Sequence, residues 1–272
     1  PRLQKNCRAR MAAIQRRMVD LHYRRPAPDR RQPDNFETGC KNLQRQTGQT
    51  PACLRKAPFA RRYHRPMLSQ RIQQQFIDSA DLKYQCAPAL APMVESAIHA
   101  VLACVTGGGK VLACGNGPSA AAAQIFAASF MGRFERERPE LAALALSADS
   151  AVITAVAQDF DPGWVYARQV RALGQTGDVL LVVGGVGQAG NLLSAVEAAH
   201  ERDMTVVALT GARGGRLTSV LRDTDVHICV PHDHPARILE VHQLVLHCVC
   251  DGVDAQLLGL PEEPLPDPEN LT

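Results

Sequence analysis

The chain has 272 residues, 46% of them hydrophobic, which is enough for one large core. No apolar run approaches the roughly 20 residues that span a membrane, and no secretory signal pattern is recognisable, so we expect a cytoplasmic protein with no membrane partner. The nine cysteines form no Cys-x-x-Cys pair, which argues against a zinc knuckle or a disulfide framework.

Charge is divided unevenly along the chain. Residues 1–66 hold 17 Lys and Arg against 4 Asp and Glu, and residues 67–272 hold 13 against 23, so the net charges are +13 and −10. The first segment lacks a sustained apolar period, which predicts a disordered basic extension. It is either an arm for electrostatic nucleic-acid binding or, as we favour, upstream sequence translated with the gene, since Met67 reads like a natural start. We expect a folded domain over residues 67–262 and a disordered tail over residues 263–272.

The rest of the chain alternates between helical and strand patterns. From Leu68 to Val105 apolar residues recur at spacings of three and four, which predicts a helical pair broken near Pro88 and Pro92. Strands separated by helices predict an α/β fold with a five-stranded parallel sheet and helices on both faces. The strands are expected to begin near Val111, Leu141, Asp178, Thr205 and Asp225, and the later helices near Ser119, Ser150, Gly163, Gly190, Gly215 and Pro235.

The turn Gly115–Ser119 has the features of a phosphate-binding turn. It follows a predicted strand and opens a helix, where unpaired amide N–H groups and the Ser119 hydroxyl suit an anion. It lacks the three-glycine spacing of a dinucleotide fingerprint. In an open α/β sheet such a site lies at the carboxyl ends of the strands, at a topological switch point.

Several motifs resemble the sugar isomerase (SIS) domain family: CGNGPSA from Cys114, GRFERERP from Gly132, VVALTGARGG from Val206 and ARILEVH from Ala236. The likeness runs from about residue 67 to residue 260 and implies a three-layer SIS fold and a homotetramer. Two branches are similar: phosphoheptose isomerases, and DiaA-type proteins that associate with the replication initiator DnaA. The motifs FAASFMGRFERERP and CVCDGVDAQLL look more like the second branch.

The resemblance also implies positions for catalysis. The isomerases use a glutamate and a histidine as base and acid, with another histidine and a glutamine completing the site, and these positions hold Ser129, His247, Ile125 and Leu239 here. A serine without a neighbouring base cannot remove a proton from carbon. We therefore expect no catalytic residues, no metal and no cofactor, since His247 alone matches the pattern and also has an ordinary structural interpretation.

The SIS family binds the sugar phosphate with a serine- and threonine-rich loop after the third strand, whereas this chain has glycines there. Each lost neutral hydrogen bond removes about 0.5–1.5 kcal/mol, so we expect a weak or vestigial phosphosugar site. Its expected residues are Asn116, Gly117, Ser119, Gly184, Gly185 and Thr210.

These observations favour a non-catalytic adaptor that binds DnaA and promotes its assembly at the replication origin, with no sequence-specific nucleic-acid contact of its own. Leu257 and Leu258 are the expected partner-binding pair, with packing inside a tetramer as the alternative. Two other functions stay open. One is a phosphoheptose isomerase acting on sedoheptulose 7-phosphate, and the other is a sugar-phosphate-binding sensor.

Overall fold

The computed structural model describes residues 68–185 and 188–259. The expected basic extension, residues 1–66, and the expected tail, residues 263–272, lie outside these ranges and stay predictions. The strands are β1 (Val111–Gly115), β2 (Ala143–Ala145), β3 (Val179–Val183), β4 (Thr205–Gly211) and β5 (Val226–Val230). The helices are α3 (Leu68–Thr106), α4 (Pro118–Met131), α5 (Ser150–Asp159), α6 (Ala167–Leu173), α7 (Gly190–Glu201) and α8 (Pro235–Leu258), with 3₁₀ segments η2 (Pro162–Trp164) and η3 (Ala212–Val220).

All five strands pair in parallel, in the order β2-β1-β3-β4-β5. This confirms the expected α/β fold with a five-stranded parallel sheet. The central strand β3 pairs on both sides, with Val179 opposite Val111 of β1 and Thr205 of β4. The chain passes from β1 outward to β2 and then returns to the other side of β1 to form β3. The direction of the winding therefore reverses between β1 and β3.

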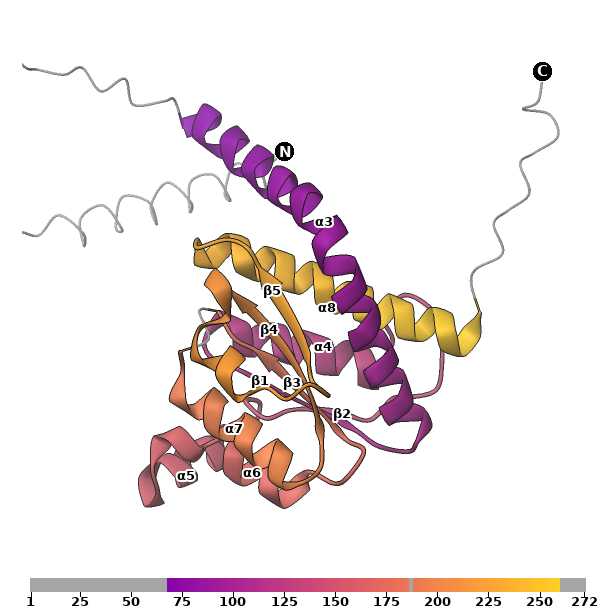
Figure 1. The fold of residues 1–272 in the computed structure, drawn as a ribbon, viewed down its shortest axis with the longest axis vertical. Coiled ribbons are helices and arrows are strands. Elements are labelled where there is room, and N and C mark those ends of the chain that lie inside the picture. Colours follow the sequence, from indigo (N-terminus) through magenta and orange to yellow (C-terminus); the bar gives the residue numbers. More distant parts are fainter. Residues whose placement is uncertain (1–67, 186–187, 260–272) are drawn as a thin grey trace, which may run out of the picture. The chain divides into compact units, whose positions relative to one another are not determined.

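Helices cover both faces of the sheet and give three layers (Figure 1). On β3, Val179, Leu181 and Val183 pack in the cluster that α3, α4 and α8 share. Leu180 and Val182 point to the other face, into the cluster that α6 and α7 dominate. Because both faces are buried, the strand reads as an unbroken apolar run. That run is the reason the strand could be located from the sequence.

The expected pair of helices at the start of the domain is wrong, because α3 is a single helix of 39 residues that contains Pro88 and Pro92. The two prolines are four residues apart and both are exposed, so water can bind the carbonyls that lose their amide partners. On the opposite side of the helix, Cys86, Leu90 and Val94 are buried in the core. Burial on that side holds the helix together through the prolines.

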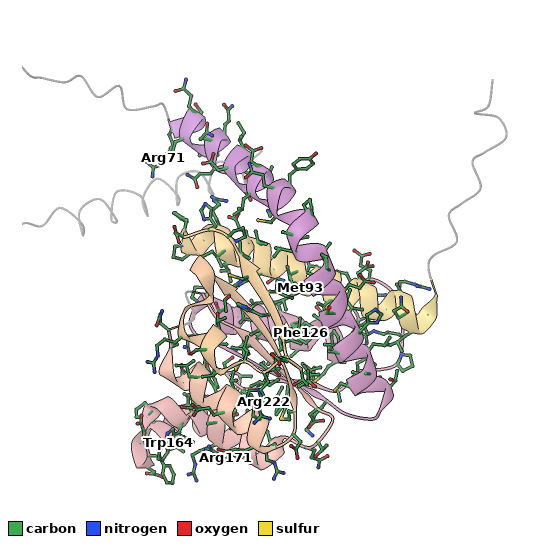
Figure 2. The ribbon with its side chains drawn as sticks, in the orientation of Figure 1. Arg71, Met93, Phe126, Trp164, Arg171 and Arg222 are labelled. Atoms are coloured by element: carbon green, nitrogen blue, oxygen red, sulfur yellow. The ribbon has the colours of Figure 1, made fainter. Side chains whose placement is uncertain are left out.

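By length and composition α3 is also apolar enough to cross a membrane. Its second half, however, packs against α8 and β5 and contributes Ala97, Val101 and Cys104 to the core. Those contacts are typical of a core helix in a folded domain. The first turns of α3 carry exposed apolar side chains, among them Ile72 and Phe76, and Figure 2 shows Arg71 near that end of the helix.

The segment expected to be a helix near Gly215 is a 3₁₀ segment instead, η3. Gly214 and Gly215 have φ angles of 80° and 59°, which lie outside the right-handed helical region. A Cβ at Gly214 would also lie 2.0 Å from the hydroxyl oxygen of Thr218. Two successive left-handed residues therefore prevent an α-helix from starting here.

Candidate functional site

The carboxyl ends of β1 and β3 lie side by side at the point where the winding of the sheet reverses. In open α/β sheets, ligands bind between the loops that follow two such strands. The loop after β1 contains Asn116 and Gly117, and the loop after β3 contains Gly184 and Gly185. We call this region the β1–β3 crevice.

The turn between β1 and α4 is built around Gly115. A Cβ on this residue would lie 2.7 Å from the carbonyl carbon and oxygen of Ser119 and 2.9 Å from the carbonyl oxygen of Val183, so only glycine fits. The amides of Ser119 and Ala120 donate to the carbonyls of Asn116 and Gly117 at 3.1 and 3.0 Å. The turn thus satisfies two of the amides that we expected to be available to an anion.

Two residues that the sequence reasoning missed fix the position of this turn. The Tyr166 hydroxyl, at the start of α6, donates to the Gly115 carbonyl and lies 3.4 Å from Asn116 Oδ1. The carboxamides of Asn116 and Asn191 bond to each other at 2.9 Å in both directions. Asn191 could have been found from the sequence, because it is a polar residue at the start of a predicted helix. No sequence pattern pointed to Tyr166.

The loop after β3 offers backbone groups and few side chains. The Gly184 amide donates to the Leu209 carbonyl at 2.8 Å, and the Gly211 amide donates to the Gly185 carbonyl at 2.7 Å. These bonds extend the pairing of β3 and β4 into the loop. Residues 186 and 187, which follow these two glycines, lie outside the described part of the chain. The structure therefore describes the expected phosphate-binding loop only in part.

Thr210, at the end of β4, is fully buried, and its hydroxyl shares a hydrogen bond of 2.8 Å with His227 Nε2. His242 Nε2 of α8 donates to the Thr210 carbonyl at 3.0 Å. Burial lowers the pKa of both histidines, so both rings are held neutral. The structure therefore places Thr210 in a buried polar network with β5 and α8, with its hydroxyl directed at a side chain of the same chain.

The catalytic positions implied by the family resemblance lie on α4 and α8. The Ser129 hydroxyl donates to the Ile125 carbonyl at 3.0 Å, the local bond of a helical serine. Ile125 is half-exposed, and Leu239 packs against the core. No carboxylate is hydrogen-bonded to Ser129 within the described residues.

His247 is exposed on α8. Its Nε2 accepts a hydrogen bond of 2.8 Å from Gln243 Nε2, and its ring lies 5.5 Å from that of Phe134, between centroids. The bond from Gln243 leaves the ring proton on Nδ1. Over residues 68–185 and 188–259, no group of three or more His, Cys, Asp or Glu side chains is placed to hold a metal ion. Leu257 and Leu258, at the end of α8, are 38% and 37% exposed.

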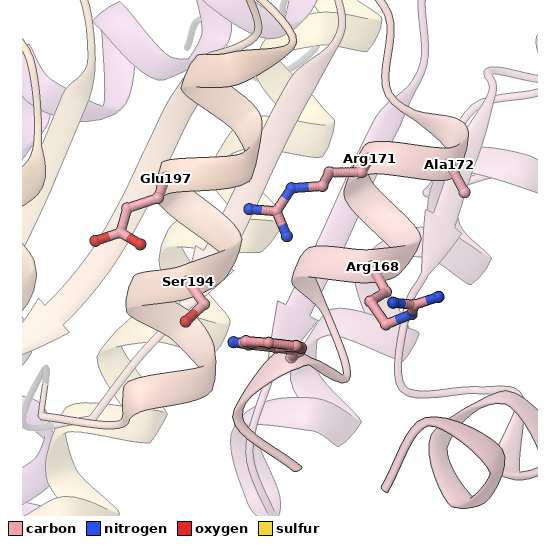
Figure 3. Close-up of a pocket in the computed structure, with 6 residues that line it drawn as sticks. Arg168, Arg171, Ala172, Ser194 and Glu197 are labelled. Atoms are coloured by element: carbon pink, nitrogen blue, oxygen red, sulfur yellow. The ribbon is translucent and has the colours of Figure 1, made fainter. Parts of the chain in front are cut away.

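A separate cavity of about 630 Å³ lies on the outer side of α6 and α7 (Figure 3). Arg171 of α6 reaches toward α7, which carries Ser194 and Glu197, but Arg171 is already paired with Glu201 at 2.6 and 3.0 Å. Arg168 lies 3.7 Å from the centroid of the Phe160 ring. Neither arginine is thus aimed at an open ligand position, and the cavity has none of the expected site residues in its lining.

Comparison with known proteins places this architecture in a family. The family model for the SIS domain matches residues 75–211. The chain belongs to the SIS domain family. The chain is 60% identical to a phosphoheptose isomerase of Methylibium petroleiphilum over 193 residues, which is 71% of this chain and 96% of the relative. It is 46% identical to a phosphoheptose isomerase of Neisseria meningitidis serogroup C over 191 residues, 70% of this chain and 97% of the relative.

Solved structures show the same likeness. Phosphoheptose isomerase GmhA of Neisseria gonorrhoeae is 44% identical and superimposes with a TM-score of 0.66, over 69% of this chain and 99% of that one. A phosphoheptose isomerase of Francisella tularensis is 43% identical with a TM-score of 0.67, over 69% of this chain and 98% of that one. The SIS fold expected from the motifs is therefore confirmed.

The expectation of a DnaA-binding adaptor is wrong. Relatives that match this chain at 46–60% identity, over almost their whole length, carry the name phosphoheptose isomerase. The short motifs that favoured the adaptor branch lie on α4, the segment after it and α8, and they supply core residues such as Phe126, Phe130 and Val253. Such motifs reported the fold that the branches share and could not distinguish their functions.

Proposed function

We propose that the protein is a phosphoheptose isomerase, which interconverts sedoheptulose 7-phosphate and its aldose isomer. The observation that carries the proposal is the 60% identity to a protein of that name over 96% of its length. The β1–β3 crevice supports it, because open α/β sheets bind their ligands at such a reversal. The phosphosugar would lie between Asn116 and the glycines after β3.

The reaction needs a base that removes a carbon-bound proton and an acid that returns one. His247 is the described residue that supports the acid role, because its ring is exposed and, with Nε2 accepting from Gln243, its Nδ1–H remains to donate. Gln243 fixes that tautomer and the orientation of the ring. Ser129 contributes a hydroxyl that is bonded within its own helix.

The distance between Gly117 and Ser129, at opposite ends of α4, is the reason that the proposal includes a multi-subunit assembly. Ser129 follows Gly117 by twelve residues in α4, and a helix rises about 1.5 Å per residue, so the two lie roughly 18 Å apart along the axis. That span exceeds an extended seven-carbon sugar phosphate. The crevice and the far end of α4 can serve one ligand only if a second copy of the chain brings them together. The homotetramer implied by the family resemblance is thus part of the proposal, as is a cytoplasmic location.

The test is turnover of sedoheptulose 7-phosphate by protein purified from a host that lacks its own isomerase, with the aldose product measured directly. We expect turnover that His247→Ala lowers by about 10²–10⁴-fold, the usual effect of losing an acid–base group. A matched control is His99→Ala, which removes an exposed ring on α3. Absence of turnover by the unmodified protein would contradict the isomerase proposal.

A second candidate is a phosphosugar-binding protein without turnover. It is favoured by Ser129, because a hydroxyl that donates to the Ile125 carbonyl at 3.0 Å has no base beside it. This function predicts that calorimetry detects binding of sedoheptulose 7-phosphate while the product assay stays at background. Binding with turnover would exclude it.

A further inference from the structure

The β1–β3 crevice is bridged by a reciprocal pair of carboxamides. Asn116 Nδ2 donates to Asn191 Oδ1, and Asn191 Nδ2 donates to Asn116 Oδ1, both at 2.9 Å. The two residues are 75 positions apart: Asn116 lies in the loop after β1, and Asn191 lies in the first turn of α7, which follows β3. Each carboxamide has two N–H donors, so each keeps a second N–H outside the pair. Each of the two residues therefore keeps one N–H that the pair does not use and that a ligand could accept.

The Asn116 side of the pair has a fixed orientation. The Tyr166 hydroxyl is buried, donates to the Gly115 carbonyl and lies 3.4 Å from Asn116 Oδ1. Burial raises the pKa of Tyr166 to about 12, so the hydroxyl keeps its proton and remains a donor. Because the single Tyr166 proton goes to the Gly115 carbonyl, Asn191 is the residue that donates to Asn116 Oδ1. Asn191 also accepts from Asn116 Nδ2, so it bonds both ends of the Asn116 carboxamide and sets the orientation of its plane.

Asn191 follows the loop after β3, in which no described residue has a hydroxyl side chain. Among the described residues of this loop and the first turn of α7, from 184 to 191 without 186 and 187, Gln188 and Asn191 alone carry polar side chains. Gln188 is exposed, whereas Asn191 is partly buried and reaches across the crevice. Asn191 is thus the polar side chain that the β3 side of the crevice provides.

We infer that Asn191 is a positioning residue of the phosphosugar site, which holds the Asn116 carboxamide so that its second Nδ2–H faces the ligand. The inference rests on the proposed function for the identity of the ligand. A neutral N–H donor suits both the hydroxyl and the phosphate oxygens of a phosphosugar. Without Asn191 the Asn116 amide can rotate, and binding must then order it again, which weakens affinity.

The test is calorimetric titration of sedoheptulose 7-phosphate into five proteins: the full chain, Asn191→Ala, Asn116→Ala, the double variant, and Gln188→Ala as a control from the same loop. We expect Asn191→Ala to weaken binding by about 3- to 10-fold, the effect of a lost neutral hydrogen bond, and Gln188→Ala to bind normally. Because Asn191 acts through Asn116, it should have no further effect once Asn116 is alanine.

A thermal unfolding curve accompanies each titration. If Asn191→Ala unfolds earlier than the unmodified chain, Asn191→Leu replaces it, since leucine keeps about the same size and adds no charge near the anionic ligand. Asn191→Leu should also weaken binding. Normal binding by a folded Asn191 variant would overturn the inference, and so would an equal effect in the presence and absence of Asn116. If the unmodified protein and Gln188→Ala both fail to bind, the proposed function itself fails, and the inference with it.

Discussion

Arg138 and Asp254 form an ion pair in which both side chains are almost completely buried, at 1% and 2% exposure. The pair joins the segment after α4 to the last turns of α8. Arg138 also donates to the carbonyls of Phe130 and Ser129, both at 2.9 Å. One arginine thus bonds two carbonyls at the end of α4 and fixes that end against α8, beside Ser129.

Removal of one partner should therefore be costly. Asp254→Ala leaves the Arg138 guanidinium buried without a counter-charge, and we expect the free energy of unfolding to fall by about 3–5 kcal/mol. The measurement is denaturant unfolding followed by circular dichroism. Glu201→Ala breaks the exposed Arg171–Glu201 pair and is the control, because water solvates the Arg171 charge that remains. Equal midpoints for the two variants would refute the assigned role.

Gly115→Ala should destabilise the protein by about 1–3 kcal/mol, because the new methyl group meets the backbone of Ser119 at 2.7 Å and backbone cannot move aside cheaply. Gly185→Ala is the control, since a Cβ there has nothing within 4 Å. Thermal unfolding of both variants makes the comparison. A Gly115→Ala protein as stable as Gly185→Ala would show that the turn is less tightly packed than described.

Stability should depend on pH through His242 and His227. Burial lowers the pKa of both rings below the ordinary value of 6.5, so below that pH the unfolded chain binds protons that the folded one does not. Their contribution is fully present above about pH 6.5 and is lost as the pH falls toward the folded pKa. Between pH 7.5 and 5.5 the midpoint should fall, and His242→Asn should flatten that dependence. His99→Asn, on the exposed side of α3, should leave the slope as it is.

Ser129→Glu restores a carboxylate at the position where the family resemblance implies the base. If proton removal limits the rate, turnover of sedoheptulose 7-phosphate should rise by about 10²–10⁴-fold over the unmodified chain. Ser129→Gln has the same length and no base, and it should show no rise. A rise with both variants would point to a change in binding, and no rise with either would show that the α4 position does not limit the reaction.

The proposed homotetramer predicts that the exposed apolar side of α3 is covered by another copy. Phe76 is 75% exposed, so Phe76→Glu places a charge on that surface without disturbing the core of one chain. We expect light scattering to report a smaller particle, while circular dichroism stays unchanged. Gln73→Glu changes the charge equally at an exposed polar position of the same helix and should leave the mass as it was. An unaltered mass for Phe76→Glu would exclude this surface from the interface.

The sequence alone located the central strands β1, β3 and β4, because they are buried on both faces and so read as apolar runs from Val111, Val179 and Val206. The edge strands β2 and β5 are shorter or only partly buried, and they were located by their spacing between helical segments. It also indicated the turn at Gly115, since a glycine between a strand and a helix marks a close backbone approach. Local pattern carries that information because a strand buried on both faces must be apolar along its length, and a turn this tight requires glycine.

Only the tertiary structure decided the rest. Pro88 and Pro92 did not break α3, because burial of Leu90 and Val94 on the opposite side outweighs the lost hydrogen bonds. The Asn116–Asn191 pair and the Arg138–Asp254 pair join residues 75 and 116 positions apart. Such contacts depend on the order of strands in the sheet and on the packing of helices against it, which no short stretch of sequence encodes.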